Sequence, residues 1–201
     1  MIDLYTAPTP NGYKVSIMLE ETGLPYNAIK IDLNAGDQKK PEFLKVNPNG
    51  KIPVIVDHEA SVTLSESGAI LIYLAEKSGK FLPSEPASRH KTIQWLFFQM
   101  ASIGPMIGQL WHFIELDPPV HYATKRYRNE AERICKVVDT QLGETRYLAG
   151  NSYSIADIAA WPWLRAFPSL GVDTDLFPNL QRWLTEISER PAVKRGLAVP
   201  G

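Results

Sequence analysis

Cysteine is almost absent from this sequence, because Cys135 is the single one among 201 residues. One thiol cannot form a disulfide within the chain, which suits a reducing compartment. The first ten residues also lack the basic segment, the apolar segment and the small-residue cleavage site of a secretory signal. These absences together lead us to expect a cytoplasmic protein.

An excess of charge of one sign is absent as well. The chain has 21 Lys and Arg residues against 22 Asp and Glu residues, for a net charge of -1. Nucleic-acid-binding surfaces normally show a basic excess, so we expect no nucleic-acid partner. No spacing of His, Cys or carboxylate residues resembles a metal site, and we expect no metal.

Formal charge is missing from residues 93–114, a stretch long enough to span a membrane. Its two glycines, Gly104 and Gly108, have the spacing of a helix contact within membranes. The stretch nevertheless contains several polar side chains, namely Gln94, Gln99, Ser102, Gln109 and His112. We therefore interpret it as a central helix buried in protein, and we expect no membrane association.

The first 80 residues alternate between strand and helix patterns. Strands are predicted at 2–5, 26–33, 52–56 and 62–64, and helices at 12–22, 41–44 and 67–77. The order β-α-β-α-β-β-α predicts a small α/β domain in which a parallel pair of strands is extended by a terminal hairpin.

Only helical patterns follow the proline-containing segment 81–86. Helices are predicted at 87–113, at 122–142, from Ser154 onward and at 178–189, the last of these stopped by Pro191. The first of them is expected to bend at Gly104-Pro105. Ser154 and Asp157 have the spacing of a capping box, which predicts a structural role for both. The fold class is therefore α/β plus all-α, with a domain at 1–80, a linker at 81–86 and an all-helical domain at 87–201.

The first helix is preceded by a loop without sulfur, Pro8-Thr9-Pro10-Asn11-Gly12. Thiol redox chemistry at this place in such a fold needs a Cys-x-x-Cys, so any thiol must arrive with a ligand. Thr9 and Asn11 would place a hydroxyl and an amide beside the N–H groups of the helix start, whose partial positive charge lowers the pKa of a bound thiol. The same two residues would also suit a helix cap and a turn. The loop alone does not decide between these roles.

Two motifs in the first half and one in the second resemble the glutathione transferase family. They are Asn47-Pro48-Asn49-Gly50-Lys51-Ile52-Pro53, Leu64-Ser65-Glu66-Ser67-Gly68-Ala69-Ile70 and Ser154-Ile155-Ala156-Asp157-Ile158-Ala159. The resemblance covers nearly the whole chain. It implies a thioredoxin-like N-terminal domain that binds glutathione as co-substrate, and a helical domain that forms the pocket for the second substrate.

The family's binding residues carry over onto matching positions of this sequence. The resemblance implies a cis peptide bond before Pro53, which offers the main chain of Ile52 to the cysteinyl part of glutathione. Glu66 and Ser67 would hold the α-ammonium and α-carboxylate groups of the γ-glutamyl end, as their chemistry allows. Gln38 and Lys51 are expected to meet the remaining polar groups.

The loop at 7–12, with Gly104-Pro105-Met106-Ile107-Gly108-Gln109 and Trp161-Pro162-Trp163, is similar to the bacterial nu-class branch of disulfide-bond reductases. In that branch a threonine and an asparagine approach the glutathione sulfur, and Thr9 and Asn11 match them. The branch also implies a homodimer, in which an arginine of the helix at 122–142 reaches the partner's glutathione. Arg126 is the matching position, with Arg128 and Arg133 close by.

The favoured hypothesis is therefore a glutathione-dependent reductase of small disulfides. A transferase that conjugates electrophiles or reduces peroxides would use the same thiolate, and a non-catalytic glutathione-binding module is a further alternative. Tyr5 deserves weighing, since several classes of the family activate the thiol with a tyrosine after the first strand. Its position at the end of an apolar strand favours packing instead.

Overall fold

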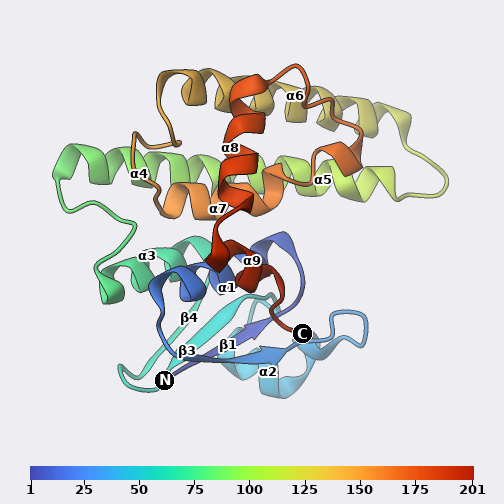
Figure 1. The fold of residues 1–201 in the computed structure, drawn as a ribbon. Helices are drawn as coiled ribbons and strands as arrows, with labels where there is room; N and C mark the ends of the chain where they lie inside the picture. The colour runs from blue at the N-terminus through green and yellow to red at the C-terminus, as the bar shows by residue number, and fades with distance from the viewer. The chain divides into compact units, whose positions relative to one another are not determined.

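The computed structural model describes residues 1–201. The chain separates into two compact units, the first made of residues 1–82 and 189–201 and the second of residues 83–188 (Figure 1). The domain limits given above stay a prediction, and the two units are described one at a time.

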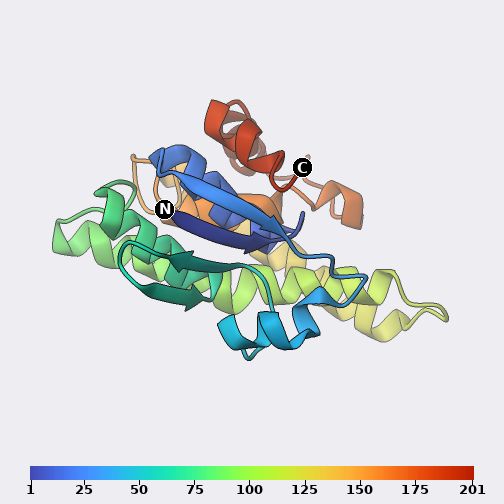
Figure 2. The same cartoon turned by 90° about the horizontal axis from the view of Figure 1, so that it is seen from below.

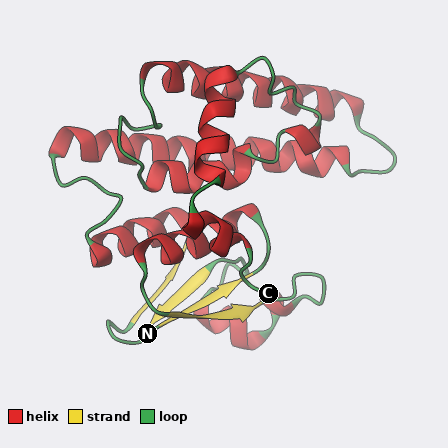
Figure 3. Ribbon diagram, viewed as in Figure 1, coloured by secondary structure: helices red, strands yellow, loops and turns green.

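A four-stranded sheet forms the centre of the first unit. Its strands are β1 (Ile2–Thr6), β2 (Tyr26–Lys30), β3 (Val54–Asp57) and β4 (Val62–Ser65), arranged in the order β2-β1-β3-β4. β1 runs parallel to β2 and antiparallel to β3, and β4 pairs antiparallel with β3. Figure 3 shows these strands in yellow. The predicted parallel pair with its terminal hairpin is confirmed, although β2 ends earlier than expected.

Helices cover both faces of this sheet. α1 (Pro10–Thr22), α3 (Ser67–Ser78) and α9 (Pro191–Leu197) lie on one face, and α2 (Pro41–Val46) with the short helix η1 (Asp37–Lys39) lies toward the other (Figures 1 and 2). α1 presents Val15, Met18 and Leu19 to the interior, where all three are fully buried. That spacing is the apolar stripe expected for a helix packed on a sheet.

The C-terminal helix α9 corrects one expectation. Pro191 does not follow the last helix but occupies the first turn of α9, where a missing N–H costs nothing. Gly196 allows α9 to approach α1 closely, because a Cβ at this position would lie 2.7 Å from the Cα of Ile17. The hydroxyl of Ser16 also donates a hydrogen bond of 2.7 Å to the carbonyl of Gly196. The end of the chain is thereby fixed to the helix that begins at the sulfur-free loop.

The second unit is entirely helical. Its elements are α4 (Pro86–Phe98), the π-helical turn η2 (Gln99–Ile103), α5 (Gly104–Ile114), α6 (His121–Glu144), α7 (Ile155–Leu164), η3 (Pro168–Leu170) and α8 (Pro178–Ser188). The predicted helix across residues 87–113 is thus interrupted by a π-helical turn that precedes Gly104-Pro105. None of the helices combines the length and the apolar character needed to cross a membrane.

The start of α7 confirms the predicted capping box. Asp157 is fully buried and accepts four hydrogen bonds, from the N–H groups of Leu148 and Ser154, the Ser154 hydroxyl and the Trp183 indole, at 2.9–3.0 Å. Burial raises the pKa of Asp157 to about 6, against the effect of these bonds. Ser154 and Asp157 therefore fix α7 to the neighbouring segments of the helical unit.

Candidate functional site

A cavity of about 150 Å³ lies in the first unit, where the beginnings of α1 and α3 meet the loop before β3. The residues that line it are Asn11, Asn47, Asn49, Lys51, Ile52, Pro53, Glu66 and Ser67. Five of the residues predicted from the sequence are therefore brought together: Asn11, Lys51, Ile52, Glu66 and Ser67.

The start of α1 contributes Asn11 and a local positive field. Thr9 is the N-cap of the helix, and its hydroxyl oxygen accepts a hydrogen bond of 3.2 Å from the N–H of Gly12. A hydroxyl that accepts one hydrogen bond still has its own hydrogen to donate. The first turn contains no acidic side chain that would offset the positive end of the helix dipole. Thr9 itself does not line the cavity.

Asn47 shapes the loop that offers Lys51 and Ile52 to the cavity. Its side chain is nearly fully buried, donates a hydrogen bond of 2.7 Å to the carbonyl of Lys51 and accepts one of 3.1 Å from the N–H of Asn49. The peptide bond between Ile52 and Pro53 is cis, as the resemblance implies. Asn47 was not among the expected site residues, although the Asn-Pro-Asn-Gly turn that begins with it was visible in the sequence.

Glu66 and Ser67 stand at the junction of β4 and α3. Glu66 is the N-cap of α3 and has a φ of 67°, an unusual conformation for a residue other than glycine. Such strained positions occur often at binding sites. Ser67 opens the helix and is buried. A carboxylate, a hydroxyl and the N–H groups of a helix start therefore meet at one end of the cavity, a set that suits a zwitterion.

Behind this end lies Lys14, which sequence reasoning missed. It is only 1% exposed, and its Nζ lies 3.3 Å from the Oγ of Ser67. Burial lowers the pKa of Lys14 to about 7, while the charge of Glu66 opposes this shift. The signal that could have revealed it is its spacing, since Lys14 lies four residues before Met18 and thus on the buried stripe of α1.

Two residues considered in the sequence analysis do not line the cavity: Gln38, which was expected to meet glutathione, and Tyr5, which was considered for thiol activation. The Gln38 amide donates a hydrogen bond of 3.4 Å to the carbonyl of Leu33, and its Oε1 is buried without a partner. Tyr5 packs its ring edge-on against Phe43, with 6.2 Å between centroids, beside a small apolar cluster. The packing interpretation of Tyr5 agrees with this geometry.

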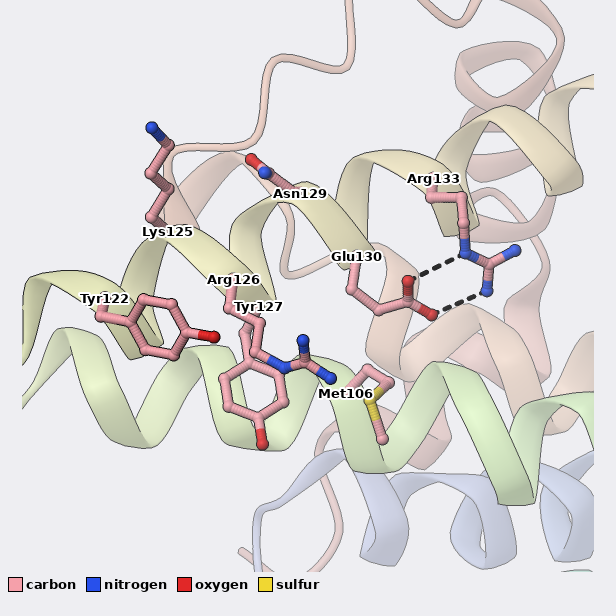
Figure 4. A pocket seen from close by; sticks show the side chains of 8 residues that line it. All are labelled: Met106, Tyr122, Lys125, Arg126, Tyr127, Asn129, Glu130 and Arg133. Carbon is pink, nitrogen blue, oxygen red and sulfur yellow. Dashed lines mark hydrogen bonds and ion pairs between the residues drawn. The ribbon is translucent and has the colours of Figure 1, made fainter.

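The second unit has a larger cavity, of about 760 Å³, along α6 (Figure 4). It is lined by Met106 of α5 and, on α6, by Tyr122, Lys125, Arg126, Tyr127, Asn129, Glu130 and Arg133. Three cations against one carboxylate make it a positively charged site. It is a candidate for binding an anionic group.

The arginines of α6 differ in how far they are already engaged. Arg128 donates to the carbonyls of Leu170 and Gly171, and Arg133 pairs with Glu130 at 2.7 Å. Arg126 has no such fixed partner, and in Figure 4 its guanidinium group lies between α6 and Met106. It is therefore the best placed of the three to meet a ligand.

The chain's own thiol is unsuited to catalysis. Cys135 is fully buried within α6, and burial raises its pKa to about 12. The structure also contains no group of three or more His, Cys, Asp or Glu side chains placed to hold a metal ion. A reaction that needs a thiolate therefore has to use the sulfur of a ligand.

Comparison with known families agrees with this fold. The model of the glutathione S-transferase N-terminal domain matches residues 1–76, and that of the glutathione S-transferase C-terminal domain matches residues 110–191. The chain belongs to the glutathione S-transferase family.

Particular relatives can be named as well. The chain is 47% identical to the disulfide-bond oxidoreductase YfcG of Escherichia coli, over 98% of this chain and 94% of that protein. It is 42% identical to the disulfide-bond oxidoreductase YghU of the same species, over 98% of this chain and 74% of that protein.

A solved structure of a glutathione transferase from Pseudomonas putida, with one glutathione disulfide bound per subunit, is similar throughout. It is 45% identical and gives a TM-score of 0.93, over 100% of this chain and 92% of that one. A family member from Pseudomonas fluorescens with two glutathione bound is 48% identical, with a TM-score of 0.93 over 99% of this chain and 93% of that one.

Proposed function

We propose that this protein is a glutathione-dependent disulfide reductase that uses the thiolate of bound glutathione as its nucleophile. The observation that carries the proposal is the meeting of Asn11 with Glu66 and Ser67 at one cavity, next to a helix start without acidic residues. The names of the relatives point to the same activity, and a structure similar throughout holds glutathione disulfide.

Each part of glutathione has a counterpart at the cavity. Glu66 pairs with the α-ammonium group, and Ser67 with the first N–H groups of α3 receives the α-carboxylate. The main chain of Ile52 pairs with the cysteinyl residue, and Lys51 meets the terminal carboxylate. This arrangement directs the sulfur toward Asn11 and the start of α1.

Asn11 and Thr9 then stabilise the thiolate. The free thiol has a pKa near 8.5, and a helix N-terminus contributes about 0.3–2 kcal/mol toward the anion. Because one pKa unit corresponds to about 1.4 kcal/mol, this effect lowers the thiol pKa by up to about 1.5 units, before any hydrogen bond from Asn11 or Thr9 is counted.

The reaction proceeds in two exchanges. The thiolate attacks one sulfur of the substrate disulfide, which forms a mixed disulfide with glutathione and releases the other sulfur as a thiolate that takes up a proton. A second glutathione thiolate attacks the mixed disulfide, which releases the remaining substrate thiol and forms oxidised glutathione. No cysteine of the protein takes part.

We also propose that the protein is a homodimer, in which Arg126 of one subunit reaches the glutathione bound by its partner. Such a role fits an arginine without a fixed partner that lines a positively charged cavity. Sedimentation equilibrium should then give twice the 22.5 kDa mass of one chain. A monomer at micromolar concentration would contradict the dimer.

The proposed activity is tested by the glutathione-dependent reduction of a small organic disulfide. We expect Asn11→Ala to lower kcat/KM by about tenfold or more, since a lost hydrogen bond to a charged group costs about 1.5–3 kcal/mol. Tyr5→Phe is the matched control and should leave the rate unchanged. Full activity in Asn11→Ala with loss of activity in Tyr5→Phe would overturn the assignment. A wild type that conjugates electrophiles but reduces no disulfide would favour the transferase alternative.

A further inference from the structure

Behind the polar end of the cavity in the first unit lies a buried lysine, Lys14, that does not line the cavity itself. Ser67 lines the cavity, and the Nζ of Lys14 lies 3.3 Å behind the Oγ of Ser67. Lys14 does not itself line the cavity and is 1% exposed, so it cannot act as a surface cation that merely attracts ligands. Its ammonium group ends at the wall where the γ-glutamyl group is placed by the proposed function.

The charges at this wall balance only when Lys14 is counted. Without Lys14, Glu66 and the zwitterionic γ-glutamyl group sum to two negative charges and one positive. With Lys14 protonated, the same group of charges is neutral. Because Lys14 is 1% exposed, solvent screens its charge only weakly, and a group of charges that includes it is more stable when the group is neutral.

We propose that Lys14 is a positioning residue for the γ-glutamyl end of glutathione, which it serves from behind the cavity wall by holding the Ser67 hydroxyl and by supplying the balancing positive charge. This inference rests on the proposed function and deepens it, since it concerns how the same site recognises the zwitterionic end of its ligand.

Several charged side chains of α1 and of the elements packed around it form ion pairs with one another. Glu20 and Glu21 lie about two turns further along α1, a rise of roughly 9–10 Å along the helix axis. Glu20 pairs with Arg195 of α9, and Glu21 pairs with Arg190, the N-cap of α9. In β3, Asp57 pairs with Lys77 of α3 at 2.8 Å. In the ligand-free protein the negative charge of Glu66 acts on Lys14 and favours its protonated form.

A measurable consequence is proton uptake on binding. Burial lowers the pKa of Lys14 to about 7, so part of the population is neutral at pH 7.5 before ligand binds. The arriving α-carboxylate favours the protonated form and raises the pKa of Lys14. Binding should therefore draw a fraction of a proton from the buffer, and affinity should fall as the pH rises above 7.

The test is calorimetric titration with S-methylglutathione at pH 7.5, in phosphate and in Tris. This probe has no ionisable thiol, so a proton released by sulfur cannot mask the effect. The difference in binding enthalpy between the two buffers measures the protons taken up. We expect net uptake in the wild type, no more than a trace in Lys14→Met, and about tenfold weaker binding by the variant, equivalent to one pKa unit of coupling.

Lys80→Met is the matched control, because Lys80 belongs to the same unit and donates to the carbonyl of Thr22 away from the cavity. It should keep the wild-type affinity and proton uptake. The wild-type measurement does not depend on any variant, so the inference remains testable even if Lys14→Met folds poorly.

The outcomes separate the two proposals. Binding by the wild type without proton uptake would overturn the role of Lys14 and leave the proposed function standing, as would undiminished affinity in Lys14→Met. A wild type that binds no S-methylglutathione would overturn both. A uniform fall in affinity of both Lys→Met variants would show a structural effect and contradict the positioning role.

Discussion

Lys14 in the first unit and Asp157 in the second are both buried charged side chains, and they differ in what surrounds them. Asp157 lies between four donors that belong to its own unit, and all of them join segments of protein. The Nζ of Lys14 lies 3.3 Å from the Oγ of Ser67 and is acted on by the charge of Glu66, and both of these residues line a cavity.

The difference shows how a structural buried charge can be told from a functional one. A buried charge with a complete set of protein partners stabilises the fold, and removing it leaves those partners unsatisfied. A buried charge that backs the wall of a binding cavity costs stability in the free protein and is compensated when a ligand of opposite charge arrives. The following variants test this distinction, from the largest expected effect to the smallest.

Asp157→Ala should cause the largest loss of stability. It leaves the Trp183 indole and the N–H groups of Leu148 and Ser154 buried without their acceptor, at about 1–3 kcal/mol each. We expect a loss of at least about 3 kcal/mol, measured by urea unfolding followed by tryptophan fluorescence. Ser154→Ala, which removes the N-cap hydroxyl alone, should cost about 1 kcal/mol. If the two variants lost equal stability, the claim that Asp157 stabilises this unit through several buried hydrogen bonds would be refuted.

Glu66→Gln should weaken ligand binding without a comparable loss of stability. It removes the carboxylate proposed to pair with the α-ammonium group and keeps the shape of the side chain. For this partly exposed pair we expect about tenfold weaker binding of S-methylglutathione by calorimetry, near 1.4 kcal/mol. Glu59→Gln, an exposed residue of the same unit, is the control and should bind normally. Equal binding by both variants would count against the placement of the γ-glutamyl end.

Lys14→Met should have the smallest effect on unfolding, in contrast to Asp157→Ala. Replacing a buried charge with an apolar side chain of similar size is often neutral or stabilising. The pH dependence gives a sharper test. The folded pKa of Lys14, about 7, lies below its ordinary value of 10.5, so between these values the unfolded chain binds more protons.

The contribution of Lys14 therefore makes the free energy of unfolding rise with pH across this window. Lys14→Met should flatten that rise, as followed by thermal unfolding between pH 7 and pH 10. A wild type and a variant with the same slope would show that Lys14 titrates at its ordinary pKa.

Much of the fold could be predicted because its signals are local. The β-α-β-α-β-β-α order follows from the alternation of periodicity, and the Ser154–Asp157 capping box from spacing alone. The π-helical turn at Gln99–Ile103 could not be predicted, since no residue in it breaks a helix and its register depends on packing. α9 was missed because Pro191 was interpreted as a stop, although proline suits the first turn of a helix equally well.

The residues of the candidate site likewise fall into those that local sequence patterns indicate and those that depend on tertiary packing. Asn11, Glu66 and Ser67 stand next to turns and helix starts, where sequence patterns are specific. Lys14 was missed because a lysine in a helix normally lies at the surface, although its spacing places it on the apolar stripe of α1. The role of Gln38 stays a prediction, because its amide hydrogen-bonds the carbonyl of Leu33 in a contact that depends on the shape of its own loop.

The central claim is that the start of α1 converts bound glutathione into a thiolate. The direct measurement is the ultraviolet titration of the bound thiol, from the thiolate absorbance of the wild-type complex with reduced glutathione as pH is raised. We expect a thiol pKa about 1–2 units below 8.5, which returns toward that value in Asn11→Ala. A bound thiol that titrates near 8.5 in the wild type would contradict the account.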